Sequence, residues 1–278
     1  MKKSLVLLLI SSLVSGLYAR QPRTVVEPPF AFRNSGTLEI ERIELAPEST
    51  TVYIQAYFRP HNWIRISSET YIRAGAEGEK LTVRSADGMP LDTEFYMPET
   101  GRHDFSLSFP PVDPKTAKID LIESDCPDCF KIYDIDLTGK KAKPGRAALA
   151  KKYKKTVPLT GNFTAPVVSD SPARIAGAIT GYDPRFFDRI EIAFYSPIVG
   201  DGATELSVLV REDGSFETGL NILTPIRGML FLPGFVTLPF YAEPGRETAL
   251  EIDLGAVYRK TSVFKELHPQ TSPVVYYG

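Results

Sequence analysis

Short stretches in which apolar and polar residues alternate are the dominant pattern of this chain. Every second residue is apolar in Val52–Phe58 and in Phe105–Phe109, and shorter stretches of the same kind recur between residues 38 and 137. A two-residue period is that of a β-strand with one buried face. Turn residues separate the stretches, and Pro110-Pro111 ends the clearest one, because proline cannot donate to a sheet. The pattern predicts a sandwich of short strands.

The stretch Ile119–Leu137 contains the chain's two cysteines, Cys126 and Cys129, between two apolar-rich segments. In the second segment the apolar positions shift by one residue between Ile132 and Ile135. Alternation predicts a strand on each side, and a shift of phase indicates a β-bulge. The four residues from one cysteine to the other are therefore expected at the tip of a β-hairpin.

A second β-rich region begins at Ala173, where ARIAGAITGY reads as a strand whose glycines allow close packing. Alternating segments continue to Leu254, and Asp213-Gly214 predicts a hairpin turn, since this pair tolerates positive φ. About seven strands are expected here, enough for a small sandwich. The predicted fold is mainly β: two β-sandwich (Ig-like or prealbumin-like) domains in tandem. Short helices are expected over 146–155 in the linker and over 259–268 near the C-terminus.

A change of composition after Leu137 marks the expected domain boundary. Residues 139–157 contain eight Lys or Arg residues and no acid. Such a basic stretch is attracted to anionic lipid or nucleic acid. A nucleic-acid-binding segment has aromatic side chains among its basic ones, whereas this stretch has only Tyr153. We therefore interpret it as a solvated linker. The expected domains are an N-terminal sandwich at 24–140, a basic linker at 141–172 and a second sandwich at 173–256. A short helix and a truncated tail at 257–278 follow.

The first nineteen residues have the pattern of a secretory signal peptide. Lys2 and Lys3 precede the apolar segment Leu5–Leu17, which is too short to span a bilayer. No later stretch approaches 18 consecutive apolar residues. Residues 20–36 are polar and contain proline, and they are expected to form an extended lead-in. The predicted location of the mature chain is the periplasm or the outer-membrane surface, an oxidising compartment.

Composition and motifs exclude several functions. The formal net charge is −2, which gives no overall attraction to nucleic acid. Hydrophobic residues make up 43% and charged residues 24%, values that are ordinary for a globular protein with a packed core. The patterns G-x-S-x-G, H-E-x-x-H, Walker A and G-x-G-x-x-G do not occur. The sequence therefore predicts no serine hydrolase, no nucleotide site and no cofactor.

The cysteine pair has two interpretations. In the structural interpretation Cys126 and Cys129 are a local disulfide, or paired thiols, that stiffens the hairpin tip. In the functional interpretation they are a redox-active dithiol. A redox dithiol of the thioredoxin type lies at a helix N-terminus, which lowers the pKa of the first thiol. Here the flanks are predicted strands, and acids such as Glu123 and Asp125 raise the pKa of a thiol. The structural interpretation is favoured.

No metal site is predicted. A zinc site would need two ligands beyond the cysteines, and His61, His103 and His268 are not in ligand spacing to one another.

The aromatic residues Tyr57 and Trp63, six positions apart in the sequence, are a candidate aromatic binding surface for a sugar or peptide. Packing against the sheet is the alternative that we favour for them.

Several stretches together resemble a known family. VYIQAYFRPHNWIRISSETYI, EFYMPETGRHDFSLSFPPV and above all IDLIESDCPDCFKIYDIDLTGKK are similar to the N-terminal, non-catalytic region of exported TlpA-like protein disulfide reductases. In that family a helical segment and a thioredoxin domain with a Trp-Cys-x-x-Cys motif follow. This chain has a single tryptophan, Trp63, and no such motif. The family's catalytic residues have no matching positions, so the resemblance implies an accessory module without its enzyme.

Three hypotheses follow. The leading one is a non-enzymatic exported envelope module that positions or binds a protein partner. The first alternative is a thiol-disulfide oxidoreductase that acts through Cys126 and Cys129. The second is a glycan- or peptide-binding β-sandwich, which predicts an exposed aromatic patch that includes Trp63. The sequence predicts no oligomeric state.

Overall fold

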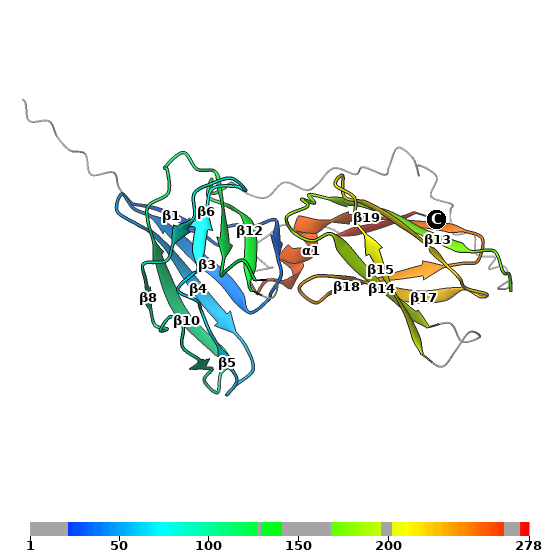
Figure 1. The fold of residues 1–278 in the computed structure, drawn as a ribbon, viewed down its shortest axis with the longest axis horizontal. Coiled ribbons are helices and arrows are strands. Elements are labelled where there is room, and N and C mark those ends of the chain that lie inside the picture. Colours follow the sequence, from blue (N-terminus) through cyan, green and yellow to red (C-terminus); the bar gives the residue numbers. More distant parts are fainter. Residues whose placement is uncertain (1–21, 127–128, 141–167, 196–201, 264–272, 278) are drawn as a thin grey trace, which may run out of the picture.

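The computed structural model describes residues 22–126, 129–140, 168–195, 202–263 and 273–277. Two β-sandwiches lie end to end along the long axis of the molecule, and the one helix of the described residues, α1 (Leu254–Thr261), lies between them (Figure 1). The fold is mainly β, as the sequence pattern predicts. The predicted signal peptide and the predicted linker helix lie outside the described residues.

The first sandwich has two five-stranded sheets, in the orders β1-β3-β4-β10-β8 and β2-β12-β11-β6-β7, and a two-stranded ribbon, β5-β9. Its strands are β1 (Arg23–Val26), β2 (Phe32–Arg33), β3 (Leu38–Leu45), β4 (Thr50–Tyr57), β5 (Trp63–Ile64), β6 (Tyr71–Arg73), β7 (Leu81–Thr82), β8 (Ser85–Asp87), β9 (Phe95–Tyr96), β10 (Arg102–Phe109), β11 (Lys118–Ile122) and β12 (Lys131–Asp136).

The second sandwich has two four-stranded sheets, in the orders β16-β13-β19-β20 and β15-β14-β17-β18. Its strands are β13 (Ala173–Thr180), β14 (Arg189–Tyr195), β15 (Ala203–Leu209), β16 (Ser215–Leu220), β17 (Ile226–Leu232), β18 (Val236–Ala242), β19 (Glu247–Asp253) and β20 (Val274–Tyr277). β13 and β19 run parallel, and the other described pairs are antiparallel.

Side chains that point between the sheets form the core of each sandwich. In β10, Phe105, Leu107 and Phe109 are buried, whereas the serines between them are half-buried. In β17 and β18 burial alternates strictly along seven residues. Gly177 in β13 allows the predicted close packing, because a Cβ there would lie 2.2 Å from Cζ of Phe216. Apolar burial of this kind provides the main stabilising free energy.

The predicted hairpin with a bulge is confirmed. β11 and β12 pair antiparallel on either side of the cysteines, and their register shifts between Ile119 and Leu121. Tyr133 and Asp134 therefore both lie opposite Asp120, and Asp134 adopts a positive φ of 55°. The side chain of Asp120 accepts a hydrogen bond from the backbone N–H of Asp134 at 3.0 Å. The bulge thus places two carboxylates side by side on one face of the hairpin.

Three local predictions differ from the structure. Residues 20–36 are not a simple lead-in, because β1 joins one sheet and β2 the other. Asp213-Gly214 does form a turn, with Gly214 at a φ of 78°, but β15 and β16 belong to different sheets, so the turn crosses the sandwich instead of closing a hairpin. The tail segment 274–277 is an edge strand, β20.

The C-terminal helix begins earlier than the predicted range 259–268. α1 starts at Leu254, directly after β19. Asp253 is its N-cap, and the Asp253 carboxylate accepts a hydrogen bond from the backbone N–H of Ala256 at 2.9 Å. An aspartate in this position stabilises a helix start. The prediction missed it because the strand pattern continues up to the cap.

Candidate functional site

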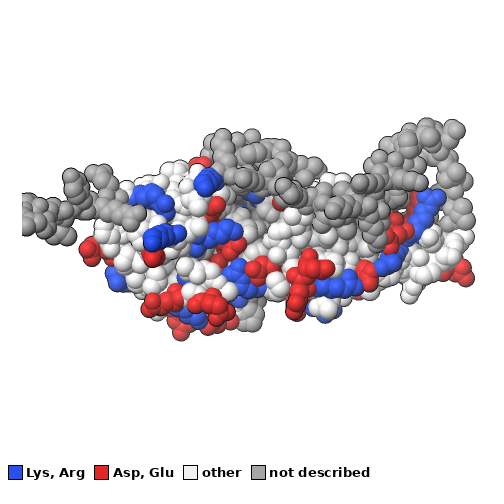
Figure 2. All heavy atoms as spheres, turned by 90° about the horizontal axis from the view of Figure 1, so that it is seen from above, with Lys and Arg blue, Asp and Glu red and all other residues white. Residues whose placement is uncertain are grey.

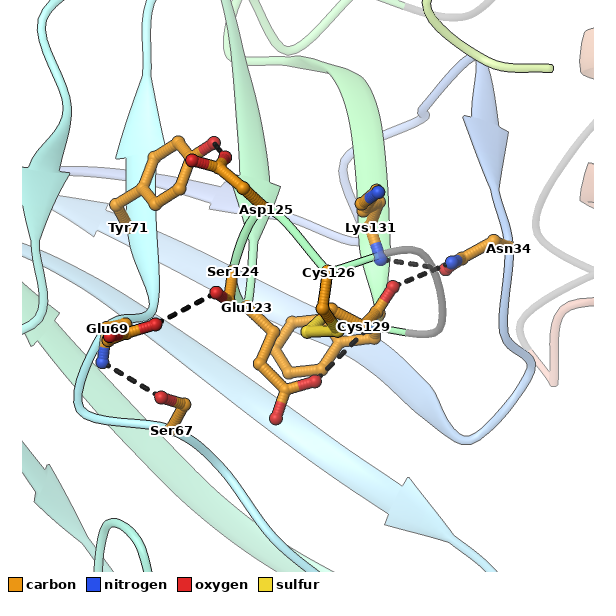
Figure 3. Close-up of a disulfide and its surroundings, with 11 residues drawn as sticks. Asn34, Ser67, Glu69, Tyr71, Glu123, Ser124, Asp125, Cys126, Cys129 and Lys131 are labelled. Carbon is orange, nitrogen blue, oxygen red and sulfur yellow. Dashed lines mark hydrogen bonds between the residues drawn. A yellow bond between two sulfur atoms is a disulfide. The ribbon is translucent and has the colours of Figure 1, made fainter.

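The disulfide of Cys126 and Cys129 lies at the tip of the β11–β12 hairpin (Figure 3). Asn34, just after β2, holds the tip through its side-chain amide. It donates to the Cys129 carbonyl at 2.7 Å and accepts from the backbone N–H of Lys131 at 2.7 Å. Glu123 accepts from the backbone N–H of Phe130 at 3.2 Å. The tip is therefore tied both to its own hairpin and to the neighbouring edge strand.

The surroundings of this disulfide are acidic. Burial raises the pKa of Glu123, whereas hydrogen bonds from Lys80 and Tyr71 lower the pKa of Asp125. Ser124 donates to Glu69 at 2.9 Å (Figure 3). The pair follows a strand and precedes a strand, so no helix dipole stabilises a thiolate here.

The candidate aromatic surface is only partly as predicted. Trp63 is 49% exposed, and Tyr96, its cross-strand partner in the β5–β9 ribbon, is 60% exposed. Directly opposed residues of an antiparallel pair project from the same face. Tyr57 lies on β4 and is half-buried, and its hydroxyl donates to Gln55 at 2.7 Å. Within the described chain no ring contact joins Tyr57 to Trp63, and the sequence reasoning missed Tyr96, the residue that does accompany Trp63.

A feature that the sequence did not predict is the contact between the two sandwiches, here called the interdomain joint. Its apolar part consists of Phe32 from β2, Tyr133 from β12, Phe186 and Phe187 from the loop after β13, and Tyr258 from α1. The ring of Phe32 stacks on Phe186 and meets Tyr258 edge-on, each with a centroid distance of 5.1 Å. Phe32, Tyr133, Phe186 and Tyr258 are buried in one hydrophobic cluster with the core of the second sandwich, and the half-buried Phe187 packs against it. Aromatic contacts of this geometry add to the free energy of burial.

A buried ion pair forms the second part of the interdomain joint. Nη1 of Arg33 lies 2.8 Å from Oε1 of Glu39, and the two side chains are only 2% and 3% exposed. The end of α1 completes the pair. Arg33 donates to the Thr261 hydroxyl at 3.1 Å, and Glu39 accepts from the Ser262 hydroxyl at 3.0 Å and from the backbone N–H of Val263 at 3.2 Å. Both charges belong to the first sandwich, whose Leu38 carbonyl also accepts a hydrogen bond from Arg33 at 3.3 Å. The end of α1 in the second sandwich supplies the other three hydrogen bonds.

The β11–β12 bulge forms the third part. Arg185, in the loop after β13, reaches Asp120 at 3.0 Å and Asp134 at 3.2 Å, and it also pairs with Asp183. Arg73 approaches Asp120 from the other side at 3.2 Å. The hydrogen bond with Asp183, followed by the charge of Asp120, raises the pKa of Arg185 despite partial burial. The arginine is therefore a permanent cation that bridges the two sandwiches.

The histidines show no catalytic arrangement. Nε2 of His103 lies 2.7 Å from the Gly88 carbonyl, and the neighbouring Asp104 pairs with Arg102 instead. His61 is exposed and lies 3.1 Å from Glu99. No group of three or more metal-ligating side chains occurs among the described residues. His268 lies outside them.

Acidic and basic side chains are interspersed over both sandwiches on the face that Figure 2 shows. Among the described residues no helix is long and apolar enough to cross a membrane.

Comparisons with known proteins identify no family. No protein-family model matches the chain, and no curated protein matches it. Among solved structures, pullulanase type I from Bacillus subtilis str. 168, complexed with maltose, matches with a TM-score of 0.26 and 8% identity over 69% of this chain and 23% of its own. Pullulanase from Anoxybacillus sp. LM18-11 matches with a TM-score of 0.25 and 8% identity over 69% and 24%. The chain spans about a quarter of these proteins, and at such TM-scores the likeness carries no argument.

Proposed function

We propose that this chain is an exported, non-enzymatic module of the cell envelope, in which two rigidly joined sandwiches present a surface to a protein partner. The interdomain joint is the observation that carries this proposal. Its buried ion pair and aromatic cluster fix the direction of the second sandwich relative to the first. A fixed two-domain body is suited to hold a partner at a set position. The envelope location rests on the predicted signal peptide and on the resemblance to the non-catalytic region of TlpA-like reductases.

The environment of the cysteines supports a structural role for them. A catalytic dithiol needs a stabilised thiolate, and Cys126 and Cys129 lie between two strands, where no helix N-terminus is present to stabilise one. The test is reduction of insulin by dithiothreitol, followed by turbidity, with the wild type and with Cys129→Ser. We expect both to match the rate without protein. Acceleration by the wild type that is lost in Cys129→Ser would instead establish the alternative function, a thiol-disulfide oxidoreductase.

An exposed apolar face on the second sandwich supports binding of a protein partner. On the outer face of the β15-β14-β17-β18 sheet the apolar side chains include Tyr195, Met229, Phe231 and Tyr241, all exposed. Met229 lies opposite Ala193, which extends the face across neighbouring strands. Exposed apolar patches of this kind mark interaction sites.

The partner surface is tested by a photo-crosslinking residue in place of Phe231, compared with one in place of exposed Glu212 in the β15–β16 turn. In cells that produce the chain we expect a discrete crosslinked protein from position 231 and none from position 212. Equal products from both positions, or none from either, would contradict this surface.

A second candidate function is glycan or peptide binding by the β5–β9 ribbon. The specific observation is that Trp63 and Tyr96 are exposed cross-strand partners. Aromatic faces of this kind bind sugar rings and proline-rich peptides. Because Trp63 is the only tryptophan, its fluorescence reports stacking directly. A saturable change on addition of an oligosaccharide or a proline-rich peptide, lost in Tyr96→Ala, would support this function, and an unchanged spectrum would remove it.

A further inference from the structure

A cleft with a volume of about 220 Å³ opens at the interdomain joint, and both sandwiches line it. The first sandwich contributes Lys118, Asp134 and Asp136, and the second contributes Gly181, Gly255 and Arg259. The volume corresponds to roughly seven water molecules at liquid density, which is the size of a small organic molecule.

The guanidinium of Arg259 distinguishes this cleft from the rest of the joint. Arg259 lies on α1 and is half-buried, and its side chain makes no hydrogen bond or ion pair with any described residue. Burial lowers the pKa of Arg259, and the nearby charge of Asp253 only partly opposes this. The other joint arginines, Arg33 and Arg185, are paired with carboxylates. Five N–H donors without a protein acceptor, in a partly desolvated position, favour an anionic ligand.

The first turn of α1 leaves room for this guanidinium. A Cβ at Gly255 would lie 2.8 Å from Nη1 of Arg259. Glycine at this position therefore allows the guanidinium to lie against the helix beside the cleft. Asp253 also lines the cleft; its carboxylate accepts a hydrogen bond from the backbone N–H of Ala256 and makes no ion pair at hydrogen-bond distance with Arg259, although its charge acts on that guanidinium.

The acids of the cleft restrict which anion fits. Lys118 neutralises Asp134 at 2.9 Å, and Asp136 accepts from the backbone N–H of Thr138 at 2.6 Å but has no cationic partner among the described residues. A multiply charged anion such as phosphate would be repelled by these carboxylates. A small molecule that carries both a carboxylate and an ammonium group satisfies both sides of the cleft.

We propose that the cleft at the interdomain joint binds a small zwitterion of the amino-acid class, with its carboxylate on Arg259 and its ammonium group toward Asp136. A guanidinium binds a carboxylate through two parallel hydrogen bonds, which gives both geometry and affinity. This ligand site is independent of the partner surface on the outer sheet. Its presence or absence does not decide whether the chain binds a protein.

The test is a titration of the full chain with glycine, followed by the amide signals of Gly181 and Gly255 in a ¹H–¹⁵N correlation spectrum. Acetate and methylammonium, at the same ionic strength, are the half-ligand probes. We expect saturable shifts of both amides with glycine and much weaker ones with either half. Absence of a saturable shift would overturn the proposal, and equal binding of acetate would overturn the zwitterion assignment.

Variants assign the site to its residues. Arg259→Gln is expected to weaken glycine binding roughly tenfold or more, because a charge-assisted hydrogen-bond pair is lost. Lys260→Gln, the same change at the exposed neighbouring position, is the matched control and should leave binding unchanged. Asp136→Asn should weaken glycine binding without weakening acetate binding. Equal affinities in the wild type and both cleft variants would refute the site.

Discussion

Removal of the buried negative charge in the interdomain joint is the perturbation with the most definite consequence. In Glu39→Gln the side chain keeps its length but loses the charge that neutralises Arg33. Three donors currently converge on the two carboxylate oxygens: the Arg33 guanidinium, the Ser262 hydroxyl and the backbone N–H of Val263. The amide NH₂ replaces one acceptor by a donor, so at least one of these donors loses its partner.

The expected loss follows from the burial of the pair. The side chains of Arg33 and Glu39 are 2% and 3% exposed, so the remaining guanidinium cannot be solvated by water. Breaking a buried ion pair on one side costs about 3–5 kcal/mol. The surface pair of Arg102 and Asp104 is the matched control, because both side chains are about half exposed. Asp104→Asn should therefore cost at most about 1 kcal/mol.

The assay is urea unfolding, followed in parallel by Trp63 fluorescence and by far-ultraviolet circular dichroism. Trp63 reports the first sandwich alone, whereas circular dichroism reports both. If the joint couples them, both signals change in one coincident transition, and Glu39→Gln lowers its midpoint far more than Asp104→Asn does. A Glu39→Gln variant no less stable than Asp104→Asn would refute the reasoning.

Three further predictions concern other parts of the fold. Tyr258→Phe should cost about 1–3 kcal/mol because the Tyr258 hydroxyl donates to a backbone carbonyl of the β17–β18 turn at 2.6 Å. Burial raises the pKa of Tyr258, so this tyrosine ionises at lower pH in the unfolded chain than in the folded one. The free energy of unfolding should therefore fall above about pH 10. Between about pH 9 and pH 11 the denaturant midpoint should fall less in Tyr258→Phe than in the wild type. Gly177→Ala should destabilise by about 1–3 kcal/mol in thermal unfolding, since its Cβ would overlap the Phe216 ring, whereas Gly36→Ala, with open space around it, should not. Cys129→Ser should cost about 2 kcal/mol in chemical unfolding, the small value expected for a four-residue loop.

The hydrophobic pattern predicted the parts of the fold that local periodicity determines. The strands around Val52 and Phe105 and the bulge near Ile135 follow from which residues must face the core. The pattern was less informative where a strand is very short. β2 has two residues, too few to show a period, although it supplies Phe32 and Arg33 to the interdomain joint.

The candidate sites were harder to predict because they depend on contacts between distant residues. Ser262 and Glu39 are separated by 223 positions, and no local pattern connects them. Charged residues are almost never buried, so Arg33 reads as a surface residue until its partners are known. The bulge was the one local signal near the joint. The phase shift at Ile135 indicated the bulge. It did not indicate that Asp120 in the bulge forms an ion pair with Arg185 of the other sandwich.

The measurement that tests the central claim most directly is the distance between the two sandwiches in solution. Spin labels at Lys115→Cys and Glu212→Cys occupy exposed positions on the first and second sandwich, and the native cysteines are protected in their disulfide. A rigid joint predicts one narrow distance distribution in pulsed electron-spin resonance, broadened by Glu39→Gln. A broad distribution in the otherwise wild-type chain would contradict the account.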